Sequence, residues 1–97
     1  MGIEVVSLRL IEPKESGLRG FADIRLDAVT IRDFRIFQRN GKPYVKAPFT
    51  TYKNQNGELC FRQIIDLPGE VRGRIDATIL SAFYREKETR NDGRQQE

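Results

Sequence analysis

The stretch FRIFQRNGKPYVKA (residues 34–47) carries the strongest local structural signal in the chain. Asn40-Gly41 lies between two extended runs, and this dipeptide favours a type I′ turn because both central positions accept a positive φ. A two-residue turn also fixes the register of the hairpin, with Ile36 opposite Val45. The sequence therefore predicts a hairpin with one apolar face.

The other face of this hairpin pairs aromatic residues with each other and cations with each other. The predicted pairs are Phe37 with Tyr44, Arg35 with Lys46, and Arg39 with Lys42. Like charges directly opposite each other destabilise a sheet unless an anion lies between them. Phosphate groups would relieve that repulsion, and aromatic rings can stack bases at about 1–3 kcal/mol each. In the alternative interpretation, the two rings form a buried pair beneath the helix or a second subunit, with the charges at its rim.

Patterns on both sides of the hairpin predict the rest of the fold. Alternating or β-branched runs predict strands at residues 3–11, 18–26, 29–38, 43–49 and 58–66. Beyond Pro68 the apolar residues recur every fourth position, which predicts an amphipathic helix over residues 69–86. We expect an α+β fold: an antiparallel sheet of about five strands within residues 3–66, followed by one C-terminal helix. The single domain spans residues 1–88, and residues 89–97 form a polar, disordered tail.

One helix can cover only one face of a sheet of that size. The other face or an edge stays available for pairing, and exposed strand edges invite it. We therefore expect a homodimer.

Basic residues are concentrated in the middle of the chain. The net charge over 97 residues is +3, yet residues 30–64 hold seven basic and two acidic residues. Because the local field matters more to an anionic partner than the net charge, this favours DNA or RNA as the partner. Lys53 and Arg62 extend the predicted contact set. Arg72 and Arg74 add a second group at the start of the helix, where anions are favoured, unless they pair with nearby acids.

Composition argues against catalysis and against a membrane location. The chain has no histidine, a single cysteine (Cys60) and no glycine-rich phosphate loop, so the usual bases and nucleophile pairs are missing. We expect no enzymatic activity, cofactor, metal or small-molecule substrate. The sequence has no apolar run of about 18 residues and no export leader, which predicts a cytoplasmic protein without a membrane span.

Several segments together resemble the stage V sporulation protein G (SpoVG) family. They are ADIRLDAVTIRDFRIF (residues 22–37), PYVKAP (43–48), NGELCFRQI (56–64) and VRGRIDATILSAFYR (71–85). The positions that match the family pattern are Asp33, Arg35, Asn40, Gly41, Pro48, Gly57, Arg62, Ile64, Arg72, Gly73 and Ile75. The chain departs from the family in its less basic loop after Pro48, in Gln63 at a usually acidic position, and in lacking a long acidic C-terminal extension.

The resemblance implies a small dimeric protein with a sheet and a C-terminal helix. Members of that family act in sporulation, septation and gene regulation, and they bind DNA and RNA with limited site specificity. Together with the basic hairpin face, the resemblance predicts a nucleic-acid-binding regulator that relies mainly on phosphate contacts. Two other classes stay open: a protein-interaction adaptor in cell division that does not bind nucleic acid, and a structural subunit that pairs through its strand edge.

Overall fold

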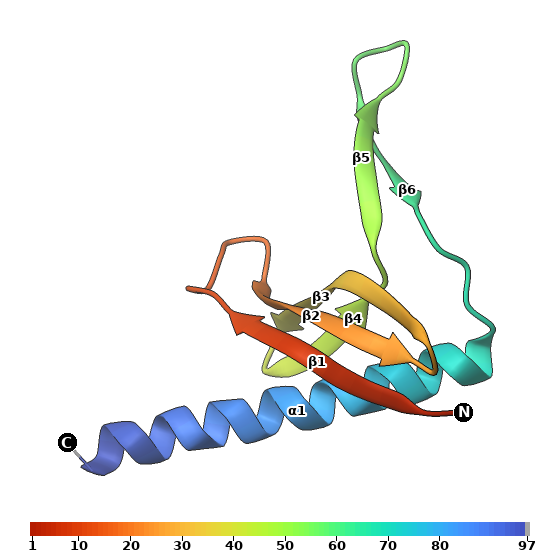
Figure 1. The fold of residues 1–97 in the computed structure, drawn as a ribbon. Coiled ribbons are helices and arrows are strands. Elements are labelled where there is room, and N and C mark those ends of the chain that lie inside the picture. Colours follow the sequence, from red (N-terminus) through yellow and green to blue (C-terminus); the bar gives the residue numbers. More distant parts are fainter. Residues whose placement is uncertain (97) are drawn as a thin grey trace.

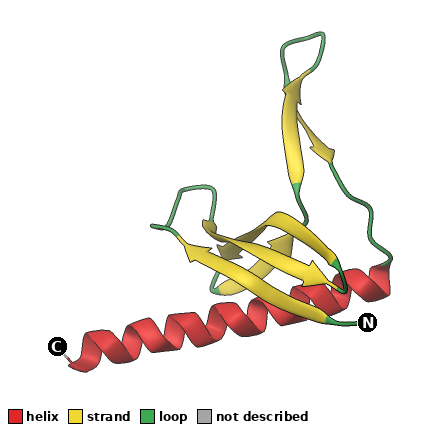
Figure 2. Cartoon of the chain, viewed as in Figure 1, coloured by secondary structure: helices red, strands yellow, loops and turns green. Residues whose placement is uncertain are grey.

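Four antiparallel strands form a sheet, and one long helix lies across one of its faces (Figure 1). The computed structural model describes the backbone of residues 1–96 and the side chains of residues 1–89. In spatial order the strands are β1 (Ile3–Leu10), β2 (Leu18–Leu26), β3 (Val29–Arg39) and β4 (Lys42–Lys46), and the helix is α1 (Gly69–Gln96). Figure 2 shows this separation of strands and helix. The predicted α+β class with a C-terminal helix is confirmed.

The β3–β4 hairpin has the register predicted from its turn. Asn40 and Gly41 have φ values of 53° and 78°, as a type I′ turn requires. Ile36 lies opposite Val45, and the neighbouring pairs follow the same register. The turn therefore determines which side chains of β3 and β4 share a face.

The core lies between α1 and the sheet. Ile75 and Ile79 of α1 are fully buried and Phe83 nearly so, which confirms the predicted helical stripe. They share the core with Ala22, Ile24, Phe34, Ile36, Val45 and Ala47. Burial of a large apolar side chain contributes about 1.5–3 kcal/mol, so this sheet face is held against the helix. We call the opposite face, which the helix does not cover, the outer face.

Asp23 joins three strands on the outer face. Its side chain is buried, and its Oδ2 accepts hydrogen bonds from Arg9 Nη1 at 3.0 Å and from Arg32 Nη1 at 3.3 Å. The backbone N–H of Asp33, a residue with a φ of 68°, donates to Oδ1 at 3.0 Å. The hydrogen bond from Arg9 holds the pKa of Asp23 below its ordinary value of 3.8, against the opposing effect of burial. Both strand registers shift at this point, so Asp23 stabilises a pair of β-bulges.

Residues 49–64 differ from the prediction. The expected strand 43–49 ends at Lys46, and the expected connection after residue 49 contains a strand, β5 (Phe49–Lys53). The predicted fifth strand corresponds to β6 (Leu59–Gln63), which pairs with β5 in a separate two-stranded sheet instead of joining the larger one. We call residues 49–63 the arm, and Figure 1 shows it projecting away from the sheet on the side opposite α1.

Pro48 explains where the arm departs. A proline has no N–H and cannot continue a strand ladder. Its carbonyl instead accepts a hydrogen bond from the N–H of Ile64 at 3.1 Å, next to the β5–β6 pairing. At the tip, Asn54 Oδ1 accepts the N–H groups of Asn56 and Glu58, both at 2.9 Å, and Gly57 has a φ of 79°. The second Asn-Gly of the chain thus closes a second hairpin.

The helix begins at the predicted residue, Gly69, and continues to Gln96, past the predicted end at residue 86. The predicted polar tail covers residues 89–97. Apart from Thr89, the side chains of these residues lie outside the described part of the chain.

We predict that Asp23→Asn lowers the free energy of unfolding at pH 7 by about 1–2 kcal/mol, because it weakens charge-assisted hydrogen bonds to partly exposed arginines. Since the pKa of Asp23 is lowered in the folded state, its stabilisation is complete above about pH 3.8 and is lost as the pH falls through the folded value. Urea denaturation of both proteins at neutral and acidic pH measures the difference. Equal stability at pH 7, or a gap that persists in acid, would contradict this role.

Candidate nucleic-acid interface

The outer face of β3 and β4 presents the predicted cations and aromatic rings together. Strand alternation directs Phe34 and Ile36 to the core, so the intervening side chains lie on the other side. The observed cross-strand pairs are Arg35 with Lys46, Phe37 with Tyr44, and Arg39 with Lys42, as predicted. Six of the ten candidate residues are therefore gathered on one surface.

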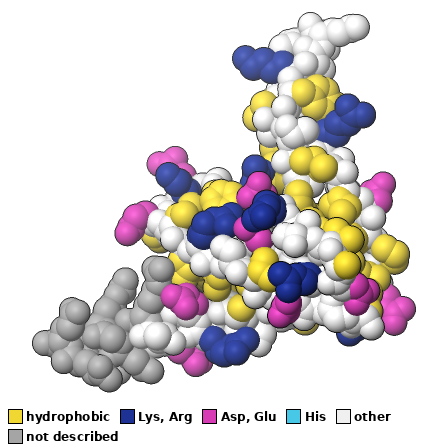
Figure 3. All heavy atoms as spheres, in the orientation of Figure 1, with side chains coloured by type: hydrophobic (Ala, Val, Ile, Leu, Met, Phe, Trp, Pro, Cys, Tyr) yellow, Lys and Arg dark blue, Asp and Glu magenta, His cyan; other side chains and the backbone are white. Residues whose placement is uncertain are grey.

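A row of three cations and one aromatic ring extends this surface across all four strands. Arg9 lies opposite Phe21, Phe21 opposite Arg35, and Arg35 opposite Lys46. We call these four residues the transverse row. With strands about 4.8 Å apart, the row spans roughly 14 Å. Figure 3 shows basic side chains over the body of the sheet, interleaved with acidic ones, and further basic side chains on the arm.

Phe37 and Tyr44 form a stacked pair on the outer face. Their ring centroids are 5.6 Å apart and their planes differ by 15°. Lys46 Nζ lies 5.4 Å from the centroid of Phe37. Both rings are half-buried, but α1 packs on the opposite face of the sheet, so the alternative in which the helix covers this pair is wrong. The pair offers a flat apolar surface beside a cation, which is the arrangement that stacks nucleobases.

Phe49, at the base of the arm, completes the site. The guanidinium carbon of Arg35 lies 3.9 Å from the centroid of the Phe49 ring, and Lys46 Nζ lies 5.9 Å from it. Such cation–π contacts contribute about 0.5–1 kcal/mol at exposed positions. They hold the Arg35 head group in place without neutralising it, so its charge stays available to an anion.

Beside Lys46 lies a hollow of about 220 Å³. It is lined by Lys46, Ala47, Phe49, Gln63 and Arg72. Lys46, which has no acidic partner among the described residues, makes the hollow suitable for an anionic group.

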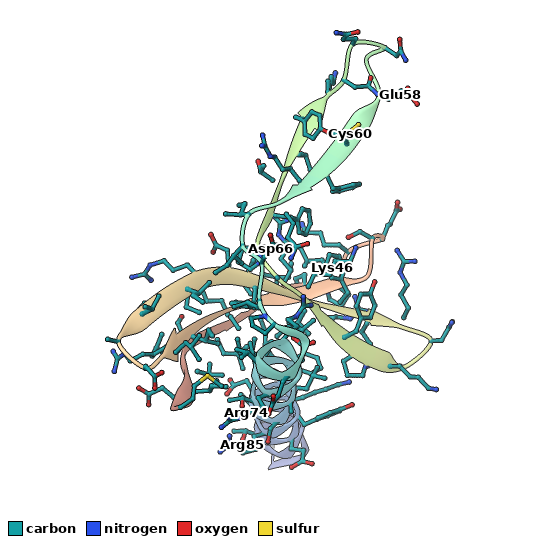
Figure 4. The ribbon with its side chains drawn as sticks, turned by 90° about the vertical axis from the view of Figure 1, so that its right-hand side faces the viewer. Lys46, Glu58, Cys60, Asp66, Arg74 and Arg85 are labelled. Atoms are coloured by element: carbon teal, nitrogen blue, oxygen red, sulfur yellow. The ribbon has the colours of Figure 1, made fainter. Side chains whose placement is uncertain are left out.

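Arg72 and Arg74, the two candidate residues on α1, make different contacts. Arg72 is bound to Asp76, with Nε 2.9 Å from the carboxylate, and its Nη2 donates to the Val45 carbonyl at 2.7 Å. These contacts confirm the simpler alternative of an acidic partner and attach the helix start to β4, although Arg72 still borders the hollow. Arg74 donates to the Met1 carbonyl at 3.2 Å, and Figure 4 shows it with Arg85 on the helix, away from Lys46.

Lys53 and Arg62 lie on the arm. Figure 4 shows the arm, with Glu58 and Cys60, extending well beyond Lys46. Lys53 is at the end of β5, and Arg62 pairs with Thr50 on β6. The structure therefore places both cations on a separate element instead of on the sheet.

The cations of the outer face differ in how far they are neutralised. Arg9 forms ion pairs with Asp23 and Asp33, and the hydrogen bond to Asp23 raises the pKa of Arg9 above its ordinary value. Within residues 1–89, neither Arg35 nor Lys46 has an acidic partner. The same is true of Arg39 and Lys42. These four cations are therefore uncompensated positive charges on this face.

Three members of the site were absent from the predicted set: Arg9, Phe21 and Phe49. Arg9 and Phe21 belong to strands predicted correctly from the sequence, but the registers that align them with Arg35 depend on bulges that local patterns do not predict. Phe49 follows Pro48, which redirects the chain, so the register of the β3–β4 hairpin does not predict its position.

The described residues include no helix with the length and apolarity of a membrane span. Within the same part of the chain, no cluster of three or more histidine, cysteine or acidic residues could hold a metal ion. Neither a known protein-family model nor any curated protein matches the chain.

We predict that Lys46→Thr changes the free energy of unfolding by less than about 0.5 kcal/mol. Relief of repulsion with Arg35 gains a few tenths of a kcal/mol, and loss of weak cation–π contacts costs a similar amount. Chemical denaturation measures the difference. A loss above about 1 kcal/mol would mean that Lys46 serves the fold and not a ligand.

Proposed function

We propose that this protein is a homodimeric regulator of the SpoVG type that binds DNA or RNA through its outer face, mainly by phosphate contacts. The proposed contacts are Arg35, Arg39, Lys42 and Lys46, with Phe37 and Tyr44 as stacking groups. Phosphate contacts position a protein without reading sequence, which agrees with the limited site specificity that the SpoVG resemblance implies. The proposed setting is regulation of gene expression, sporulation or septation in the cytoplasm.

The observation that carries the proposal is the pairing of uncompensated cations across β3 and β4. Arg35 faces Lys46 and Arg39 faces Lys42, one pair on each side of Phe37 and Tyr44. Neither like-charge pair has an acidic partner among the described residues. This arrangement weakens the free protein slightly, and a polyanion would turn the same repulsion into binding energy. The adjacent rings add a surface suited to bases.

A second candidate is a protein-interaction adaptor, and the apolar side chains of the arm favour it. Phe61 and Leu59 are 65% and 60% exposed, and such residues mark protein contacts more often than nucleic-acid contacts. The adaptor predicts salt-sensitive binding to an acidic protein and negligible affinity for DNA or RNA at physiological salt.

We predict that Arg35→Gln/Lys46→Gln weakens binding to all nucleic-acid sequences. The slope of log K against log salt should decrease in magnitude by about 1.8 for duplex DNA or 1.4 for a single strand, since each phosphate contact contributes roughly 0.9 or 0.7. Fluorescence anisotropy with labelled single- and double-stranded DNA and RNA, at several salt concentrations, measures both quantities.

The matched control is Arg85→Gln/Lys87→Gln, which removes the same charge from α1 on the other side of the sheet. It should lower affinity only slightly and leave the slope within about half a unit of the wild type. A folded Arg35/Lys46 variant with wild-type affinity and slope would refute the proposed interface.

A further inference from the structure

The arm exposes a concentration of apolar side chains. Tyr52, Leu59, Phe61 and the adjoining Ile64 are 50–65% exposed. They make up half of the eight large hydrophobic residues that are exposed in the described part of the chain. Grouped apolar exposure of this kind marks an interaction site.

Strand alternation places Leu59 and Phe61 on one face of the arm and Tyr52 on the other. In the β5–β6 register Thr51 lies opposite Phe61, and Lys53 lies opposite Leu59. The rings of Phe49 and Phe61 meet edge to face at 5.5 Å, so they share that face. We call Phe49, Thr51, Leu59 and Phe61 the apolar face of the arm, which Lys53 borders near the tip and Gln63 at the base.

Beyond its base, where Phe49 packs against Arg35, the arm has no packing partner in the core of the described residues. It forms a sheet separate from that of β1–β4, and the core contains no residue from β5 or β6. A two-stranded hairpin alone is at best marginally stable in water. The apolar face therefore needs a surface to pack against.

We infer that this surface is the arm of a second copy of the chain, packed antiparallel to the first through the same apolar face. The inference rests on the homodimer of the proposed function and names its interface. It replaces the expectation that the free sheet face or a strand edge makes the dimer. A two-fold contact uses the same patch on both partners, and each arm supplies an apolar patch of matching length.

The charges on the arm favour a second copy over a nucleic acid. The apolar face has one cation, Lys53, at its end, and Leu59 offers no ring for a base. In an antiparallel contact the two Lys53 side chains lie at opposite ends. The tip of each arm, which carries Glu58, then meets the base of the other near the cations Arg35 and Lys46. A parallel contact would bring the two Lys53 side chains together.

This dimer leaves open the part of the proposed nucleic-acid surface around Arg39 and Lys42, away from the base of the arm. Arg62 pairs with Thr50 and so lies on the other face of the arm. Arg39 and Lys42 flank the β3–β4 turn, at the opposite end of those strands from the base of the arm. Two copies would thus present two cationic faces, which raises apparent affinity for a long polyanion through bivalency.

The test is the mass in solution of the wild-type chain and of Leu59→Thr/Phe61→Thr, measured by light scattering or sedimentation over a range of concentrations. Threonine keeps strand propensity, and both positions lie outside the core, so the variant should keep the wild-type circular dichroism. The matched control is Val6→Thr, which changes an exposed apolar residue on the edge strand β1.

We expect twice the chain mass of 11.2 kDa for the wild type and the control, and the single-chain mass for the double variant at concentrations where the wild type is dimeric. A monomeric wild type, a dimeric double variant, larger oligomers, or loss of the dimer in the control would each overturn the inference. If the double variant does not fold, Phe61→Thr alone must raise the dimer dissociation constant at least tenfold.

Nucleic-acid titration separates this inference from the proposed function. The monomeric double variant should keep a salt-dependent affinity for a short oligonucleotide that spans one outer face. Loss of the dimer with retained binding supports both claims. A dimer that persists in the double variant refutes the arm interface while leaving the cationic face intact.

Discussion

The register of the β3–β4 hairpin is the constraint on which the rest of the structure depends. Because side chains alternate along a strand, a slip of one residue would turn Phe34 and Ile36 outward and bring Arg35 and Phe37 beneath α1. The Asn40-Gly41 turn prevents this slip, and the apolar stripe of α1 reinforces the same choice. A single turn therefore determines both the core and the charged surface.

The structure separates two kinds of surface that the sequence places close together. The sheet carries unpaired cations beside aromatic rings, whereas the arm carries apolar residues with few charges. Pro48 is the point of separation, since it ends the ladder of β4 and redirects the chain. Phe49 belongs to both surfaces, because its ring supports Arg35 on the sheet and contacts Phe61 on the arm.

Local patterns predicted much of the fold and part of the candidate site. The turn, the β3–β4 pairing and the buried face of α1 follow from short-range chemistry, so they could be predicted. The partner of β6 could not, because its sequence fits a strand in any sheet and its pairing depends on where Pro48 turns the chain. Arg9 and Phe21 were missed for a related reason: the registers that align them with Arg35 depend on bulges at Asp23, and these bulges depend on hydrogen bonds between distant residues.

The central claim is that the outer face is an open surface for a polyanion. The most direct test maps backbone amide chemical shifts while an oligonucleotide is added to the labelled protein. The largest shifts should cluster on β3 and β4, around Arg35, Phe37, Tyr44 and Lys46. Shifts confined to α1 or to the tip of the arm, or no shifts at low salt, would contradict it.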